Sequence, residues 1–148
     1  MSLQSRLQDA LKAAMLARDA ERTGALRLLK SAFGYVQIEK KTDELADPEA
    51  LVVVQREAKK RRDAIEEYER GGRPELAAKE RAELRVIEEF LPQPLSPAEL
   101  EELVKAAIAE AGAVSKKDLG AVMKIATARA AGRADGRGLS AAAGRLLS

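Results

Sequence analysis

The residues that could do chemistry in this chain are carboxylates, lysines, arginines, tyrosines and hydroxyls, because the sequence holds no histidine and no cysteine. That composition excludes a Ser-His-Asp triad, a Cys-His pair, a His/Cys zinc site and any disulfide. Neighbouring acids such as Glu66 and Glu67, or Glu88 and Glu89, could act as general acid and base or bind Mg²⁺. They stand at helical spacings from basic residues, as Glu89 does from Arg85, which is typical of solvated helix faces. We therefore predict no catalytic residue, no metal site and no cofactor.

Arg61 is the one basic residue that falls in an apolar helical stripe, seven residues after Val54 and seven before Tyr68. A buried guanidinium needs a charged partner. The favoured hypothesis is an ion pair with Glu80 or Glu83 of a neighbouring helix. The alternative is an arginine that faces a ligand in a groove.

Basic side chains gather in the last third of the chain. Residues 1–91 hold 18 basic and 18 acidic side chains, residues 92–115 have a net charge of −3, and residues 116–148 have a net charge of +5. A basic segment is a candidate footprint for a polyanion such as RNA, and a solvated basic face is the plainer alternative. The candidate phosphate-binding residues are Lys116, Lys117, Lys124, Arg129, Arg133 and Arg137.

The glycine-rich segment 132–138 carries two of these arginines, Arg133 and Arg137, between its glycines. Exposed backbone N–H groups and guanidinium groups could converge there on a phosphate. The segment does not have the spacing of a phosphate loop. A turn that ends one helix and begins the next is therefore the favoured interpretation.

Helical periodicity runs through the whole chain, and no strand pattern competes with it. The expected helices span residues 3–18, 20–40, 48–70, 74–91, 97–111, 116–132 and 136–147. Start and stop signals for the fifth and sixth are a capping box at Ser96 and Glu99, Gly112 just past the end of the fifth, and Ser115 as the cap of the sixth. In the first of them, an apolar residue recurs every four positions up to Met15. Asp47 and Pro48 fit the N-cap and the first position of the third helix. Gly34, inside the second helix, could let another helix approach closely. The predicted fold class is all-α.

Three prolines between residues 92 and 97 cannot continue a helix. They predict a four-helix N-terminal domain at 1–91, a Pro-rich linker at 92–96 and a small three-helix C-terminal domain at 97–148. No stretch approaches the roughly 20 apolar residues of a membrane span. The first residues lack the apolar core of a signal peptide. We expect a cytoplasmic protein that does not enter a membrane.

Several segments, in order, carry a resemblance to a known family. They are Arg56-Glu-Ala-Lys-Lys-Arg-Arg-Asp-Ala-Ile65, Gly72-Arg-Pro-Glu-Leu76, Lys79-Glu-Arg-Ala-Glu-Leu84, Phe90-Leu-Pro-Gln-Pro-Leu-Ser-Pro-Ala-Glu-Leu100, Lys117-Asp-Leu-Gly-Ala-Val-Met123 and Gly132-Arg-Ala-Asp-Gly136. Over essentially its whole length the chain resembles the YqeY family of small bacterial proteins. That family is related to the tail of the B subunit of the glutamyl/aspartyl-tRNA amidotransferase, which contacts the tRNA body.

The resemblance implies an all-α fold with a helical N-terminal part and a small three-helix C-terminal part. The positions that match the family's motifs are Lys59, Arg61, Lys117, Asp118, Gly120, Met123, Gly132, Arg133, Ala134, Asp135 and Gly136. None of them is a catalytic position in the family. Leu119 stands where methionine is usual, and Glu75 where aspartate is usual. A proline expected soon after Met123 is also absent.

Two hypotheses about function follow from the resemblance and the basic segment. The first is an accessory module that binds tRNA, or that associates with the amidotransferase or with aminoacyl-tRNA synthetase components. The alternative is a protein–protein helical adaptor without a nucleic-acid role. The family is catalogued as a carbon–nitrogen ligase with glutamine as amido donor, but no residue constellation in this chain supports stand-alone transamidation.

Overall fold

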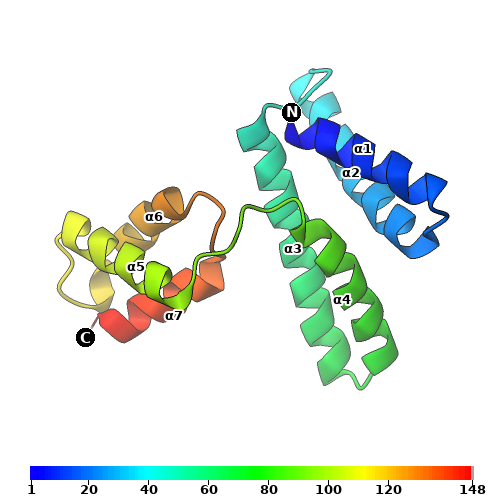
Figure 1. Ribbon diagram of the computed structural model, residues 1–148. Helices are drawn as coiled ribbons and strands as arrows, with labels where there is room; N and C mark the ends of the chain where they lie inside the picture. The colour runs from blue at the N-terminus through cyan, green and yellow to red at the C-terminus, as the bar shows by residue number, and fades with distance from the viewer. Residues whose placement is uncertain (148) are drawn as a thin grey trace. The chain divides into compact units, whose positions relative to one another are not determined.

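The computed structural model describes residues 1–147, and every regular element in that range is helical (Figure 1). The predicted all-α class is confirmed. The first unit, residues 1–91, contains α1 (Leu3–Leu16), α2 (Ala20–Lys40), α3 (Asp47–Arg70) and α4 (Pro74–Glu88). The second unit begins at residue 92 and contains α5 (Pro97–Ala111), the short 3₁₀ helix η1 (Lys116–Asp118), α6 (Leu119–Ala130) and α7 (Gly136–Leu146).

The first unit is built from two helical hairpins, α1 with α2 and α3 with α4, which share one core (Figure 1). Leu7, Leu26, Leu29 and Phe33 are almost fully buried, and Val54 of α3 joins them. Burying a side chain of this size contributes about 1.5–3 kcal/mol. The core therefore holds the four helices in place without any disulfide.

Met15 does not belong to this core, although the four-residue repeat placed it there. Its side chain is 50% exposed, whereas the neighbouring Ala14 is buried. An α-helix turns through 3.6 residues, so a repeat of four drifts around the helix by about 40° at each step. Three steps after Leu3 the repeat has left the buried side of α1.

Asp47 plays a different part from the predicted one. Ala46 is the N-cap of α3, and Asp47 is its first helical residue. The Asp47 carboxylate instead accepts a hydrogen bond from the backbone N–H of Leu3 at 2.9 Å, at the start of α1. The predicted cap was wrong because a partner 44 residues away competes for this side chain.

The second unit follows the predicted start and stop signals closely. At the start of α5, the Ser96 hydroxyl accepts the Glu99 N–H at 3.1 Å and the Glu99 carboxylate accepts the Ser96 N–H at 3.0 Å. Gly112 ends the helix in the left-handed region at φ +65°. The core is aliphatic, with Val104, Val122 and Leu139 at its centre.

Ser115 caps the predicted sixth helix, as expected, but the first turn is the 3₁₀ helix η1 and not α-helical. The α-helix α6 ends at Ala130, two residues before the predicted end near Gly132. The Asp118 carboxylate accepts the Val114 N–H at 3.0 Å, which ties the α5–η1 loop to the start of α6. Within residues 1–147, no helix is long and apolar enough to cross a membrane.

Candidate nucleic-acid interface

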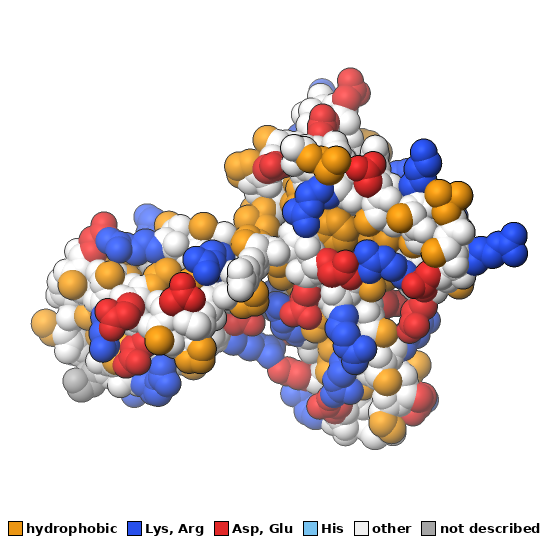
Figure 2. Space-filling view, viewed as in Figure 1, with side chains coloured by type: hydrophobic (Ala, Val, Ile, Leu, Met, Phe, Trp, Pro, Cys, Tyr) orange, Lys and Arg blue, Asp and Glu red, His pale blue; other side chains and the backbone are white. Residues whose placement is uncertain are grey.

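The six basic residues predicted to bind phosphate all belong to the second unit, but the structure uses them in different ways. Lys116 and Lys117 lie in η1, Lys124 and Arg129 in α6, Arg133 in the turn after α6, and Arg137 in the first turn of α7. In Figure 2, cationic and anionic side chains alternate over the visible face of this unit. No single basic patch dominates that view.

Arg129 joins two helices of the second unit. Its Nε and Nη2 atoms donate to the same oxygen of Glu110 on α5, at 3.1 and 2.6 Å. Both side chains remain about half exposed. The charge of Arg129 is therefore compensated within the unit, and this arginine is a weaker phosphate ligand than the sequence suggests.

Arg133 anchors the proline-rich segment. Its Nε donates to the carbonyl of Gln93 at 2.9 Å, and its own carbonyl accepts the Leu95 N–H at 2.9 Å. Its Nη2 lies 3.7 Å from a carboxylate oxygen of Glu99. These contacts hold residues 93–95 against the turn between α6 and α7. The main contribution of Arg133 is therefore structural.

The three lysines are placed differently, because Lys116, Lys117 and Lys124 are exposed and have no ion-pair partner within residues 1–147. Lys117, in the 3₁₀ helix η1, and Lys124, in α6, are seven residues apart. Gly120 lies between them, and a Cβ placed there would meet no atom within 4 Å. The lysines therefore present uncompensated positive charge, and the helix surface beside Lys117 and Lys124 carries no side chain at Gly120.

Arg137 is exposed in the first turn of α7, but it is not without a partner. The Asp135 carboxylate accepts the Gly138 N–H at 2.8 Å and caps α7. Gly132 has φ +83°, a conformation that favours glycine. The glycine-rich segment 132–138 thus forms the turn between α6 and α7, as the favoured interpretation of the sequence predicted.

Local contacts explain some of the other residues that match the family's motifs, but not all of them. Lys59 pairs with Asp63 at 3.0 Å on the exposed side of α3. Asp118 and Asp135 cap backbone N–H groups, as described above. Nothing in the structure explains the glycines at Gly120 and Gly136, where an added Cβ would have open space.

The predicted pairing of Arg61 is confirmed. Its Nε lies 3.0 Å from Glu83 and 3.5 Å from Glu80, both on α4, and its Nη1 lies 3.8 Å from Glu57 on α3. The Arg61 side chain is only 12% exposed, and its Nε has no hydrogen bond of good geometry. The contact is thus mainly electrostatic and joins α3 to α4.

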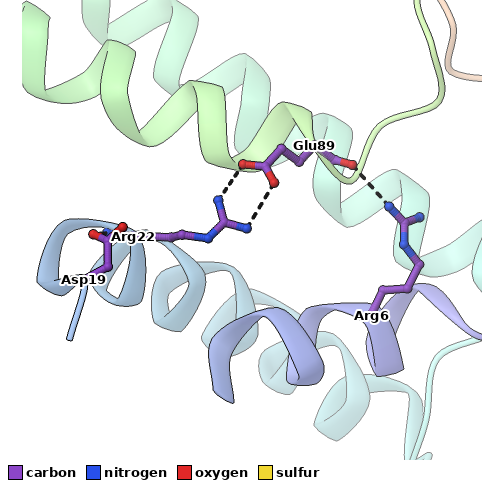
Figure 3. Close-up of polar contacts among 4 residues, drawn as sticks. All are labelled: Arg6, Asp19, Arg22 and Glu89. Atoms are coloured by element: carbon purple, nitrogen blue, oxygen red, sulfur yellow. Dashed lines mark hydrogen bonds and ion pairs between the residues drawn. The ribbon is translucent and has the colours of Figure 1, made fainter. Parts of the chain in front are cut away.

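Sequence reasoning missed a second polar junction, shown in Figure 3. Arg22 on α2 donates through both terminal nitrogens to the Glu89 carboxylate, at 2.6 and 3.0 Å, and this contact raises the pKa of Arg22. Arg6 on α1 donates to the Glu89 carbonyl at 3.2 Å and lies over the Phe90 ring. The sequence had assigned Glu89 to a solvated face beside Arg85, because a partner 67 residues away leaves no local pattern.

Within residues 1–147, the fold and these contacts define a small all-helical protein of two units. The family described as Yqey-like protein matches residues 4–147, nearly the whole chain. The chain therefore belongs to the YqeY family. A search of curated proteins found no match.

Proposed function

We propose that this YqeY-family protein is an accessory module that binds tRNA through the second unit and works beside the enzymes of tRNA-dependent amidation. The observation that carries the proposal is the set of three exposed lysines, Lys116, Lys117 and Lys124, whose charge no carboxylate in residues 1–147 compensates. Lysines of this kind bind phosphates and release counterions. The kinship of the family with the amidotransferase tail supports tRNA as the RNA.

The contacts of the arginines sharpen this proposal. Arg129 and Arg133 are engaged with Glu110, Gln93 and Glu99. Charge reversal at either arginine would disturb the second unit as well as any RNA contact. The lysines are the cleaner test, because their side chains make no contact that the fold needs.

The test compares tRNA binding by the wild type and by the triple variant Lys116→Glu, Lys117→Glu, Lys124→Glu, using fluorescence anisotropy over a range of salt concentrations. We expect the wild-type affinity to fall steeply with salt. We expect the variant to bind at least about tenfold more weakly at low salt, with a salt slope smaller by about 2–3, because each phosphate contact adds roughly 0.7–0.9 to the slope.

A matched control carries the same charge change in the first unit: Lys12→Glu, Arg56→Glu, Lys79→Glu. All three residues are exposed. This control should retain most of the affinity and the slope. Equal losses in both variants would show a non-specific effect of net charge. Failure of the wild type to bind tRNA at low salt would refute the proposal.

A further inference from the structure

One side of α2 carries an apolar stripe that the fold leaves uncovered. The stripe consists of Leu28, Tyr35 and Ile38, and the small residues Gly24 and Ser31 share its side of the helix, because all five follow one another at spacings of four and three. Leu28 is 47%, Tyr35 76% and Ile38 77% exposed. The opposite side of α2 already supplies the core of the first unit. The stripe is therefore additional apolar surface.

Two glycines of α2 are unexplained by the packing of the first unit. A Cβ added at Gly24 or at Gly34 would meet no atom within 4 Å. Glycine inside a helix costs about 1 kcal/mol relative to alanine. The close approach of another backbone is the usual reason to keep a glycine despite that cost.

Charged side chains border the stripe unequally. Helical geometry places Arg27, and Lys30 one turn further on, along one edge, and Glu21 and Glu39 at the two ends of the other edge. All four are exposed, and none has an ion-pair partner among residues 1–147. The basic edge is thus an uncompensated pair of cations beside an apolar surface.

We propose that this face of α2 binds an amphipathic helix of a partner protein. The partner helix would place apolar side chains over Leu28, Tyr35 and Ile38, and Asp or Glu residues along the edge that meets Arg27 and Lys30. Helices bind in this way through side chains at a repeat of three and four residues. This surface belongs to the first unit, so the inference is independent of the tRNA proposal.

Charge complementarity favours such a partner over two other occupants. Two antiparallel copies of α2 would bring basic edge against basic edge. Two parallel copies would set the basic edge against the opposite edge of the stripe, where acidic residues stand only at the two ends. An anionic membrane attracts basic segments but gains nothing from Glu21 and Glu39.

Site-specific photo-crosslinking in the native host tests the inference with the full chain. A photoreactive amino acid replaces Tyr35 or, separately, Ile38, and a matched control carries it at Lys12, an exposed residue of α1. We expect adducts from positions 35 and 38 but not from 12. The crosslinked partner segment, mapped by mass spectrometry, should be an amphipathic helix with acidic residues along one edge.

A charge reversal completes the experiment. Arg27→Glu with Lys30→Glu should reduce the adduct yield at position 35 several-fold, whereas Arg56→Glu with Lys79→Glu, at exposed residues of α3 and α4, should leave it unchanged. The inference is overturned if no adduct forms, or if the adduct contains a second copy of this chain, residues from its own second unit, RNA or lipid. A partner segment without an acidic edge would overturn it as well.

Discussion

The burial of the Arg61 side chain determines how much this residue matters for the stability of the first unit. Three carboxylates from α3 and α4 lie within 4 Å of its guanidinium, and all four side chains are largely shielded from water. A buried ion pair adds little net stability when it is intact, but removal of one partner leaves uncompensated charge in a poorly solvated place. Removal of the Arg61 guanidinium alone should therefore cause a large loss of stability.

Arg61→Ala is expected to lower the free energy of unfolding of the first unit by about 3–5 kcal/mol. Urea denaturation followed by tyrosine fluorescence measures this change. Lys60→Ala is the matched control, because Lys60 also pairs with Glu57 but is 63% exposed. An exposed pair contributes only about 0–1 kcal/mol. If both variants lost a similar amount of unfolding free energy, burial would not explain the effect of Arg61.

At the level of the helices, side-chain caps begin several elements, and the cap of α5 was readable from local sequence. Ser96 and Glu99 cap α5, and Asp135 caps α7. A carboxylate in such a cap is stabilised by the backbone N–H groups that it accepts. The Ser96 N–H, together with the Ser96 hydroxyl and the nearby Arg133, lowers the pKa of Glu99 below its ordinary value of 4.5.

This lowered pKa predicts how the stability of the second unit depends on pH. A carboxyl group whose pKa is depressed by folding stabilises the folded state fully above its unfolded-state pKa, and the contribution is lost as the pH falls through the folded-state pKa. The contribution of Glu99 should therefore be complete at pH 7 and decline below about pH 4.5. In Glu99→Gln this part of the pH dependence should disappear.

Far-UV circular dichroism during thermal unfolding, repeated from pH 7 to about pH 3, checks this expectation against the wild type. The control is Glu102→Gln, because Glu102 lies on the same helix and the Glu102 side chain is 77% exposed. Identical pH profiles for the wild type and Glu99→Gln would show that the cap does not contribute.

At the scale of the whole molecule, the two units have separate cores of different chemistry. Both tyrosines and both phenylalanines lie in the first unit, at Phe33, Tyr35, Tyr68 and Phe90. The second core is aliphatic, and the chain has no tryptophan. Aromatic signals therefore report on the first unit alone, whereas far-UV circular dichroism reports on the helices of both.

We expect unfolding of the full chain to depart from two-state behaviour. The transition seen by tyrosine fluorescence should not coincide with the transition seen by circular dichroism, because the cores can lose their packing separately. Arg61→Ala should move the fluorescence transition and leave the second-unit part of the dichroism transition in place. Coincident transitions in the wild type and in this variant would refute the separation.

The sequence anticipated the helices well because helix formation is governed by neighbours three and four residues apart. The sequence predicted less about the candidate nucleic-acid interface. The basic third of the chain was visible in the charge count, but the division between engaged arginines and uncompensated lysines was not. Glu110 lies 19 residues from Arg129, and Gln93 lies 40 residues from Arg133. Such distances leave no periodic signal.

Local sequence alone predicted the all-α class, the approximate helix bounds, the caps of α5 and η1, and the pairing of Arg61 with α4. These features rest on local spacing, or on a polar residue within an apolar stripe that must find a partner nearby. The packed structure was needed to show that Asp47 accepts the Leu3 N–H at the start of α1, that Glu89 joins α2 to α4, and that Arg133 anchors the proline-rich segment. Each of these contacts joins residues at least 40 positions apart, and such residues meet only when packed helices bring them together.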